Sequence, residues 1–155
     1  MTTESAIAAT TTIPVKRLSE HATLPSRHSA HAAGMDLAAC LPDGPVRIEP
    51  RSIAMIPCGF AMAVPVGFEA QVRPRSGLSC KHGMTLPNSP GTIDSDYRGE
   101  VFVPLINHGV EVFTVEHQMR IAQMVIAPVV LADAVDVDSL DETPRGTGGF
   151  GSTGL

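Results

Sequence analysis

Prolines and glycines divide this chain into pieces too short for long helices. The 155 residues include 13 prolines and 14 glycines. Between them, apolar and polar residues alternate or short apolar runs occur, as in FEAQVRP, GEVFVPLIN and RIAQMVIAPVV. Such patterns are typical of β-strands, whose side chains point to the two faces of a sheet in turn. Because no long stretch has a helical period, we expect an all-β sandwich or barrel with at most one or two helical turns.

The composition predicts one domain with loose ends. Residues 1–12 are rich in Thr and Ala and are predicted to form a flexible N-terminal extension, residues 13–138 the β domain, and residues 139–155 a mobile C-terminal arm. Aromatic residues make up only 4% of the chain and Trp is absent, so the core must be aliphatic. A monomer built in this way leaves apolar faces for a partner, which favours an oligomer.

Charge and cysteine content exclude several classes of protein. The net charge of −5 argues against a nucleic-acid binder, whereas nine arginines among the eleven basic residues suit a small anionic ligand. Three cysteines without a C-x-x-C spacing predict no disulfide framework or zinc ribbon, and hence a reduced, cytoplasmic setting. The N-terminus does not resemble a signal peptide, and the longest apolar run is interrupted by Pro128, so we expect no membrane partner.

Two polar stretches near the first half of the chain are candidates for a binding site. AAGMDLAAC places Asp36 inside an apolar run, where it is either a site residue or an ordinary turn or hydrogen-bonding residue. RPRSGLSCKHG combines guanidinium groups, hydroxyls and a glycine in Arg75, Ser76 and Gly77, which is the equipment of an anion-binding loop. A plain polar turn is an equal alternative from this stretch alone.

Two further stretches, later in the chain, are also candidates for a binding or catalytic site. LPNSPGTIDSDYRGEVFVPL predicts a long hairpin in which Asp94 is a candidate general base and Tyr97 offers a flat face, although DSDY could also be a solvated tip. In RIAQMVIAP, Arg120 and Gln123 are an odd number of residues apart, so they are predicted to lie on opposite faces of one strand. One of the two is then expected at a site or subunit contact and the other at a structural pairing. The histidines show no metal-ligand spacing, and the usual nucleotide-loop and hydrolase motifs are absent.

The glycine-rich end, RGTGGFGSTGL, completes a set of five ordered motifs. AGMDL, PRSGLS, NSPGTIDSDYRGE, RIAQM and RGTGGFGSTG together resemble the motifs of the homotrimeric dUTP diphosphatases, or dUTPases, over residues 13–155. The resemblance implies a distorted jelly-roll (β-clip) subunit, and a homotrimer with an exchanged C-terminal arm and three active sites at its interfaces. It also implies hydrolysis of dUTP to dUMP and pyrophosphate with Mg²⁺, which keeps uracil out of DNA and supplies dUMP for thymidylate synthesis.

The same resemblance assigns roles to residues. Asp94 matches the catalytic base, which activates water for attack on the α-phosphorus. The hairpin from Asn88 to Phe102 matches the segment that reads uracil, and Tyr97 matches the residue packed on deoxyribose. The implied substrate-binding residues are Arg75, Ser76, Gly77, Asn88, Thr92, Ile93, Asp94, Tyr97, Phe102, Gln123, Arg145, Phe150, Gly151, Ser152 and Thr153.

In this interpretation the phosphates contact the second and fourth motifs and the tail. Arg145, Ser152 and Thr153 match contacts to the γ-phosphate, and Phe150 matches the ring that stacks on uracil. Asp36 matches a supporting acid near an arginine or the water shell of the metal. No protein side chain is expected to bind the metal directly, because the substrate phosphates and water hold it.

Two other hypotheses are open at this stage. One is the related dCTP deaminase branch, alone or as a bifunctional enzyme, although GTIDSDYRGE follows the dUTPase pattern. The other is a nucleotide-binding regulator or structural trimer without turnover, which would need neither a positioned base nor a closing arm. The one departure from the family pattern is His31, where a small residue is more usual.

Overall fold

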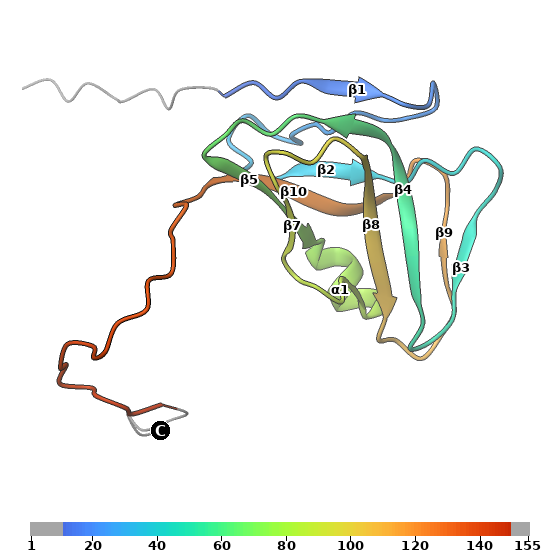
Figure 1. Cartoon of the computed structure of the whole chain (residues 1–155). Coiled ribbons are helices and arrows are strands. Elements are labelled where there is room, and N and C mark those ends of the chain that lie inside the picture. The colour runs from blue at the N-terminus through green and yellow to red at the C-terminus, as the bar shows by residue number, and fades with distance from the viewer. Residues whose placement is uncertain (1–10, 150–155) are drawn as a thin grey trace, which may run out of the picture.

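Two four-stranded antiparallel sheets form the body of the protein (Figure 1). The computed structural model describes residues 11–149. One sheet has the order β1 (Val15–Arg17), β4 (Ile53–Met62), β8 (Glu100–Asn107), β6 (Met84–Thr85). The other has the order β2 (Met35–Ala38), β10 (Arg120–Pro128), β5 (Phe68–Pro74), β7 (Gly91–Ile93). A two-stranded sheet pairs β3 (Val46–Ile48) with β9 (Phe113–Val115), and the single helix in this part of the chain is α1 (Ser76–His82). The all-β prediction is confirmed.

The core is aliphatic, as the composition predicts. Of the largest fully buried side chains in the described residues, Phe60 is the only one with an aromatic ring. Strand β8 shows how the pattern works, because Val101, Val103 and Leu105 are buried while the side chains between them are more exposed. Burial of alternate side chains is what fixes the register of a strand with one face on the core.

The outer face of β4 and β8 is also apolar. Three cross-strand pairs lie on this face because each pair is separated from the next by two residues. Ile53, Met55 and Phe102 expose 55%, 59% and 39% of their surface. The full set of pairs is Ile53 with Ile106, Met55 with Pro104, and Pro57 with Phe102. We call these six residues the outer apolar face.

The segment expected to form a long hairpin joins the two large sheets instead. β7 pairs with β5, whereas β8 pairs with β4 and β6, so β7 and β8 do not pair with each other. The hairpin prediction is therefore wrong in its pairing. The alternation of each strand shows which face it buries, but not which distant strand supplies its hydrogen bonds. The tip, residues 94–99, is the crossing between the sheets.

The C-terminal segment leaves the body after β10. Val129 donates a backbone hydrogen bond to Gly67, and residues 130–147 are all exposed. Figure 1 shows this segment running away from the two sheets. Across residues 11–149, no helix has the length and apolar character needed to cross a bilayer.

Candidate functional site

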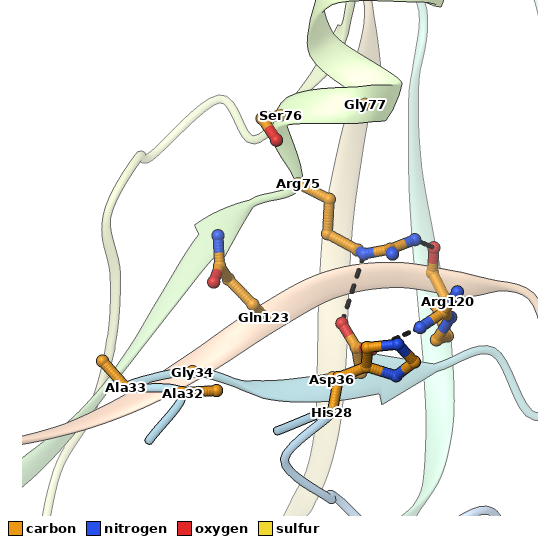
Figure 2. Close-up of a pocket in the computed structure, with 10 residues that line it drawn as sticks. All are labelled: His28, Ala32, Ala33, Gly34, Asp36, Arg75, Ser76, Gly77, Arg120 and Gln123. Atoms are coloured by element: carbon orange, nitrogen blue, oxygen red, sulfur yellow. Dashed lines mark hydrogen bonds and ion pairs between the residues drawn. The ribbon is translucent and has the colours of Figure 1, made fainter. Parts of the chain in front are cut away.

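A polar pocket opens where β2, β10 and the junction of β5 with α1 meet (Figure 2). Its volume is about 370 Å³. Its walls are built by His28, Ala32, Ala33, Gly34, Asp36, Arg75, Ser76, Gly77, Arg120 and Gln123. Three of the five predicted motifs therefore meet in one place, together with the segment that precedes the first.

Asp36 is held between two arginines at the centre of the pocket. Its Oδ1 lies 3.2 Å from Nε of Arg75, and its Oδ2 accepts a hydrogen bond of 2.9 Å from Nη1 of Arg120. Arg75 also donates to the backbone carbonyl of Arg120 at 2.9 Å. Two guanidinium groups thus share one carboxylate, which leaves one net positive charge among these three side chains. Of the two predicted partners of Asp36, an arginine is the one observed.

Ser76 and Gly77 add neutral donors to the same wall. They are the first two residues of α1, and the first intrahelical bonds are donated by Leu78 and Ser79 to the carbonyl of Arg75. The N–H groups of Ser76 and Gly77 are therefore not used within the helix. A serine hydroxyl beside them gives this wall donors suited to phosphate oxygens.

Gln123 and Gly34 shape the opposite wall. Gln123 donates from Nε2 to the carbonyl of Pro74 at 3.0 Å, which fixes its side chain. A Cβ atom at position 34 would lie 2.5 Å from Oε1 of Gln123, so a larger residue there would displace this amide. The glycine of AGMDL thus lets the chain pack closely against the side-chain amide of Gln123.

Arg120 and Gln123 lie on the same face of β10, which corrects the prediction of opposite faces. Gln123 pairs with Asp36 on β2, and Arg120 pairs with Ala38, two residues further along. A β-bulge between Arg120 and Ala122 makes Ile121 an extra residue on this strand. The extra residue restores the even spacing, so both polar side chains reach the pocket.

The predicted catalytic base lies far from this pocket in the same chain. Among the described lining residues there is none from the segment 88–102. Ile93, the residue before Asp94, pairs with Ala70 on β5. Arg75 follows the other end of β5, about 17 Å away at 3.3 to 3.4 Å per residue. Asp94 is exposed at the start of the crossing between the sheets.

Tyr97 is held across the crossing by short-range contacts. Its hydroxyl donates to the carbonyl of Glu100 at 2.8 Å, and its N–H donates to the carbonyl of Asp94 at 3.2 Å. A Cβ at Gly99 would lie 2.4 Å from the Tyr97 hydroxyl oxygen, so the ring lies directly on this glycine. Tyr97 is 44% exposed and presents its ring at the surface.

The remaining predicted residues either lie away from the pocket or lie outside the described residues. Asn88 and Thr92 are exposed on either side of Gly91, and Phe102 belongs to the outer apolar face. Arg145 is exposed and donates from Nε to the carbonyl of Gly148 at 3.0 Å, away from the pocket residues. The tail residues Phe150, Gly151, Ser152 and Thr153 lie outside the described residues.

Two polar pocket residues, Arg120 and His28, are absent from the set assigned from the sequence. The sequence predicted that only one of Arg120 and Gln123 lies at a site or subunit contact, and the bulge that turns both toward the pocket has no signature in RIAQM. His28 lies eight residues before Asp36, but Ser26 forms an isolated bridge with Asp36 and so brings the intervening segment to the pocket. A histidine in a polar loop gave no sign of this placement.

The donor set does not form a direct metal site. Among residues 11–149, no three His, Cys, Asp or Glu side chains are grouped to hold an ion. Both oxygens of Asp36 contact arginines. A cationic pocket of this kind fits Mg²⁺ that arrives on phosphate oxygens and keeps part of its water shell.

The family follows from comparison with known proteins. A family model for dUTPase matches residues 20–154. The chain belongs to the dUTPase family. This confirms the family and the enzyme class predicted from the five motifs. The pocket described above is thus built by the first, second and fourth dUTPase motifs.

Curated relatives and solved structures agree. The deoxyuridine 5′-triphosphate nucleotidohydrolase of Syntrophotalea carbinolica is 59% identical over 94% of this chain and 99% of its own length. That of Maricaulis maris is 55% identical over 92% of this chain and 97% of its own. A mutant dUTPase of Staphylococcus bacteriophage 80alpha, solved with dUpNHpp, has a TM-score of 0.85 at 26% identity, covering 94% of this chain and all of that one. The jelly-roll-like dUTPase fold is confirmed.

Proposed function

We propose that this chain hydrolyses dUTP to dUMP and pyrophosphate by attack of a water molecule on the α-phosphorus. Asp94 takes a proton from the water while the water oxygen forms a bond to the α-phosphorus. The bond from the α-phosphorus to the oxygen that bridges it to the β-phosphate breaks, and pyrophosphate leaves. A carboxylate within reach of a water can act in this way. Mg²⁺ on the phosphates would neutralise the charge that develops on the leaving group.

The paired arginines on Asp36 are the observation that carries this proposal. They give the pocket a net positive charge, and Ser76, Gly77 and Gln123 surround it with neutral polar groups. Such a mixture of guanidinium, hydroxyl and backbone donors suits the β- and γ-phosphates of a nucleotide. The pocket occurs in a chain of the dUTPase family, which selects dUTP as the substrate.

The distance from the pocket to Asp94 supports a site shared between copies. Arg75 and the Ile93 end of β7 lie about 17 Å apart along β5, and none of the described residues that line the pocket comes from the segment 88–102. This supports placing the Asp94 of another copy beside the α-phosphorus. We therefore assign the phosphate pocket to one copy and Asp94, with the uracil-reading segment from Asn88, to another.

The outer apolar face supports assembly of a homotrimer. Its exposed Ile53, Met55 and Phe102 form a continuous patch with three half-buried neighbours. Exposed patches of this kind mark protein contacts more often than open surface. In the proposed trimer, this face packs between subunits and brings the pocket of one copy to the Asp94 of the next.

The C-terminal arm completes the site in this proposal. Arg145, Ser152 and Thr153 contact the γ-phosphate, Phe150 with Gly151 covers uracil, and the arm comes from a third copy. The exposed course of residues 130–147 away from their own body supports such an exchange. Deletion of residues 145–155 should leave the trimer folded and lower turnover strongly. An unchanged rate would contradict a role for the arm.

The test of the reaction is pyrophosphate release from dUTP with Mg²⁺. Asp94→Asn should lower kcat at least about a hundredfold, because a general base contributes about 10² to 10⁴. Asp96→Asn is the matched control, since it removes the same charge from an exposed position two residues away. Wild-type protein without pyrophosphate release would overturn the proposed activity. Equal rates of the wild type and Asp94→Asn would overturn the assigned base.

A further inference from the structure

His28 lies at the rim of the phosphate pocket on a segment that β2 holds in place. The N–H of Asp36 donates to the carbonyl of Ser26 at 2.9 Å, and Ala32 closes a turn onto Ser29 at 3.1 Å. The first bond anchors the segment to β2 at Ser26, and the second closes a local turn just after His28. Its ring lines the same pocket as Asp36 and Arg120, as Figure 2 shows. His28 is exposed, so its imidazole is accessible to a ligand.

The charged groups around His28 leave no free carboxylate for it. Asp36 from β2 is the sole carboxylate among the described lining residues, and both of its oxygens contact arginines. Arg75 at the end of β5 and Arg120 on β10 are cations, as is Arg27 on the same segment as His28. An imidazole in this setting has an N–H to donate but meets mostly other donors. The acceptor it suits is therefore an anionic ligand.

We propose that His28 is an additional binding residue for the pyrophosphate portion of the substrate. The inference rests on the proposed function, because it places the β- and γ-phosphates in this pocket. A neutral imidazole supplies one hydrogen bond to a phosphate oxygen, and a protonated imidazole adds a positive charge. His28 thus adds a third hydrogen-bonding group to the two arginines.

The test is calorimetric titration with inorganic pyrophosphate at one fixed Mg²⁺ concentration and one fixed pH. His28→Ala removes the ring, and His28→Lys replaces it with another hydrogen-bond donor. His31→Ala is the matched control, because His31 is exposed on the same segment but does not line the pocket. Each affinity is compared with that of the control under the same conditions.

We expect His28→Ala to weaken pyrophosphate binding about five- to tenfold, since hydrogen bonds to a charged phosphate are the stronger ones. His28→Lys should bind within about twofold of the wild type, because its ammonium group also donates to phosphate oxygens. With dUTP as substrate, the loss in His28→Ala should fall mainly on KM.

Equal pyrophosphate affinities for His28→Ala and His31→Ala would overturn the inference. A loss in His28→Ala with no recovery in His28→Lys would overturn the part played by a hydrogen-bond donor at this position. The calorimetric measurement needs no turnover, so it tests His28 separately from the proposed reaction. Absence of pyrophosphate release from dUTP by the wild type would count against the reaction alone.

Discussion

Replacing Asp36 by Asn tests whether this carboxylate positions the two arginines of the phosphate pocket. Asn keeps the size of the side chain but removes the charge that both guanidinium groups contact. Removing one partner of a fully buried ion pair costs about 3–5 kcal/mol, whereas exposed pairs contribute about 0–1 kcal/mol. The side chains of Asp36, Arg75 and Arg120 are 21%, 28% and 47% exposed. The network lies between the two limits, so we expect Asp36→Asn to lower the free energy of unfolding by about 1–2 kcal/mol, mostly through the lost contact with Arg75.

The effect on substrate binding has a sign that separates two explanations. If Asp36 positions the arginines, Asp36→Asn lets them move apart, and KM for dUTP should rise about tenfold, or about 1.4 kcal/mol. If Asp36 only reduces the charge of the pocket, its removal raises the net charge of the three side chains from one to two. Phosphate binding would then tighten.

The assays are urea unfolding at one fixed protein concentration and steady-state pyrophosphate release. A fixed concentration is needed because assembly changes apparent stability. Asp43→Asn is the control, since it removes the same charge from an exposed turn before β3. A KM for Asp36→Asn that is equal to or lower than that of the wild type would refute the positioning role.

Three further predictions concern assembly, stability and thiol reactivity. Met55→Glu puts a charge on the outer apolar face and should break the trimer into smaller species, as measured by light scattering. Val66→Glu in the exposed β4–β5 turn is the control and should leave the trimer intact. An intact Met55→Glu trimer would contradict the assigned interface. Asn107→Ala should cost about 3 kcal/mol in chemical unfolding, since it removes three hydrogen bonds of a fully buried side chain, and a cost below about 1 kcal/mol would contradict this. Burial raises the pKa of the Cys58 thiol to about 12. At pH 8, iodoacetamide should therefore modify the exposed Cys80 at least about a hundredfold faster than the buried Cys58. Equal modification rates, measured by mass spectrometry, would contradict this prediction.

The sequence predicted the class of fold well because burial in a β-sandwich leaves a direct pattern. The alternation in β8 shows which side chains enter the core, and the structure confirms it. The pairing of strands leaves no such pattern. β7 and β8 are close in sequence and were expected to form a hairpin, yet each pairs with a strand more distant in the chain.

The sequence predicted which residues lie together where a motif supplies both chemistry and position. Asp36, Arg75, Ser76, Gly77 and Gln123 line one pocket. The placement of Arg120 beside Gln123, and of His28 at the rim, was not predictable, because it depends on a β-bulge and on a loop bridged to β2. A single inserted residue reverses the face of a strand, and no propensity of the residues in RIAQM indicates it.

The central claim is that dUTP is hydrolysed at a site built from more than one copy of the chain. The most direct measurement is activity after unfolding and refolding an equal mixture of Arg75→Ala, which lacks part of the pocket, and Asp94→Asn, which lacks the base. Each variant refolded alone should be nearly inactive. Random mixing gives about one quarter of the sites an intact Asp94 from one copy and an intact pocket from another, so about a quarter of wild-type activity should return. A mixture no more active than its two parents, in trimers shown to contain both chains, would contradict the shared site.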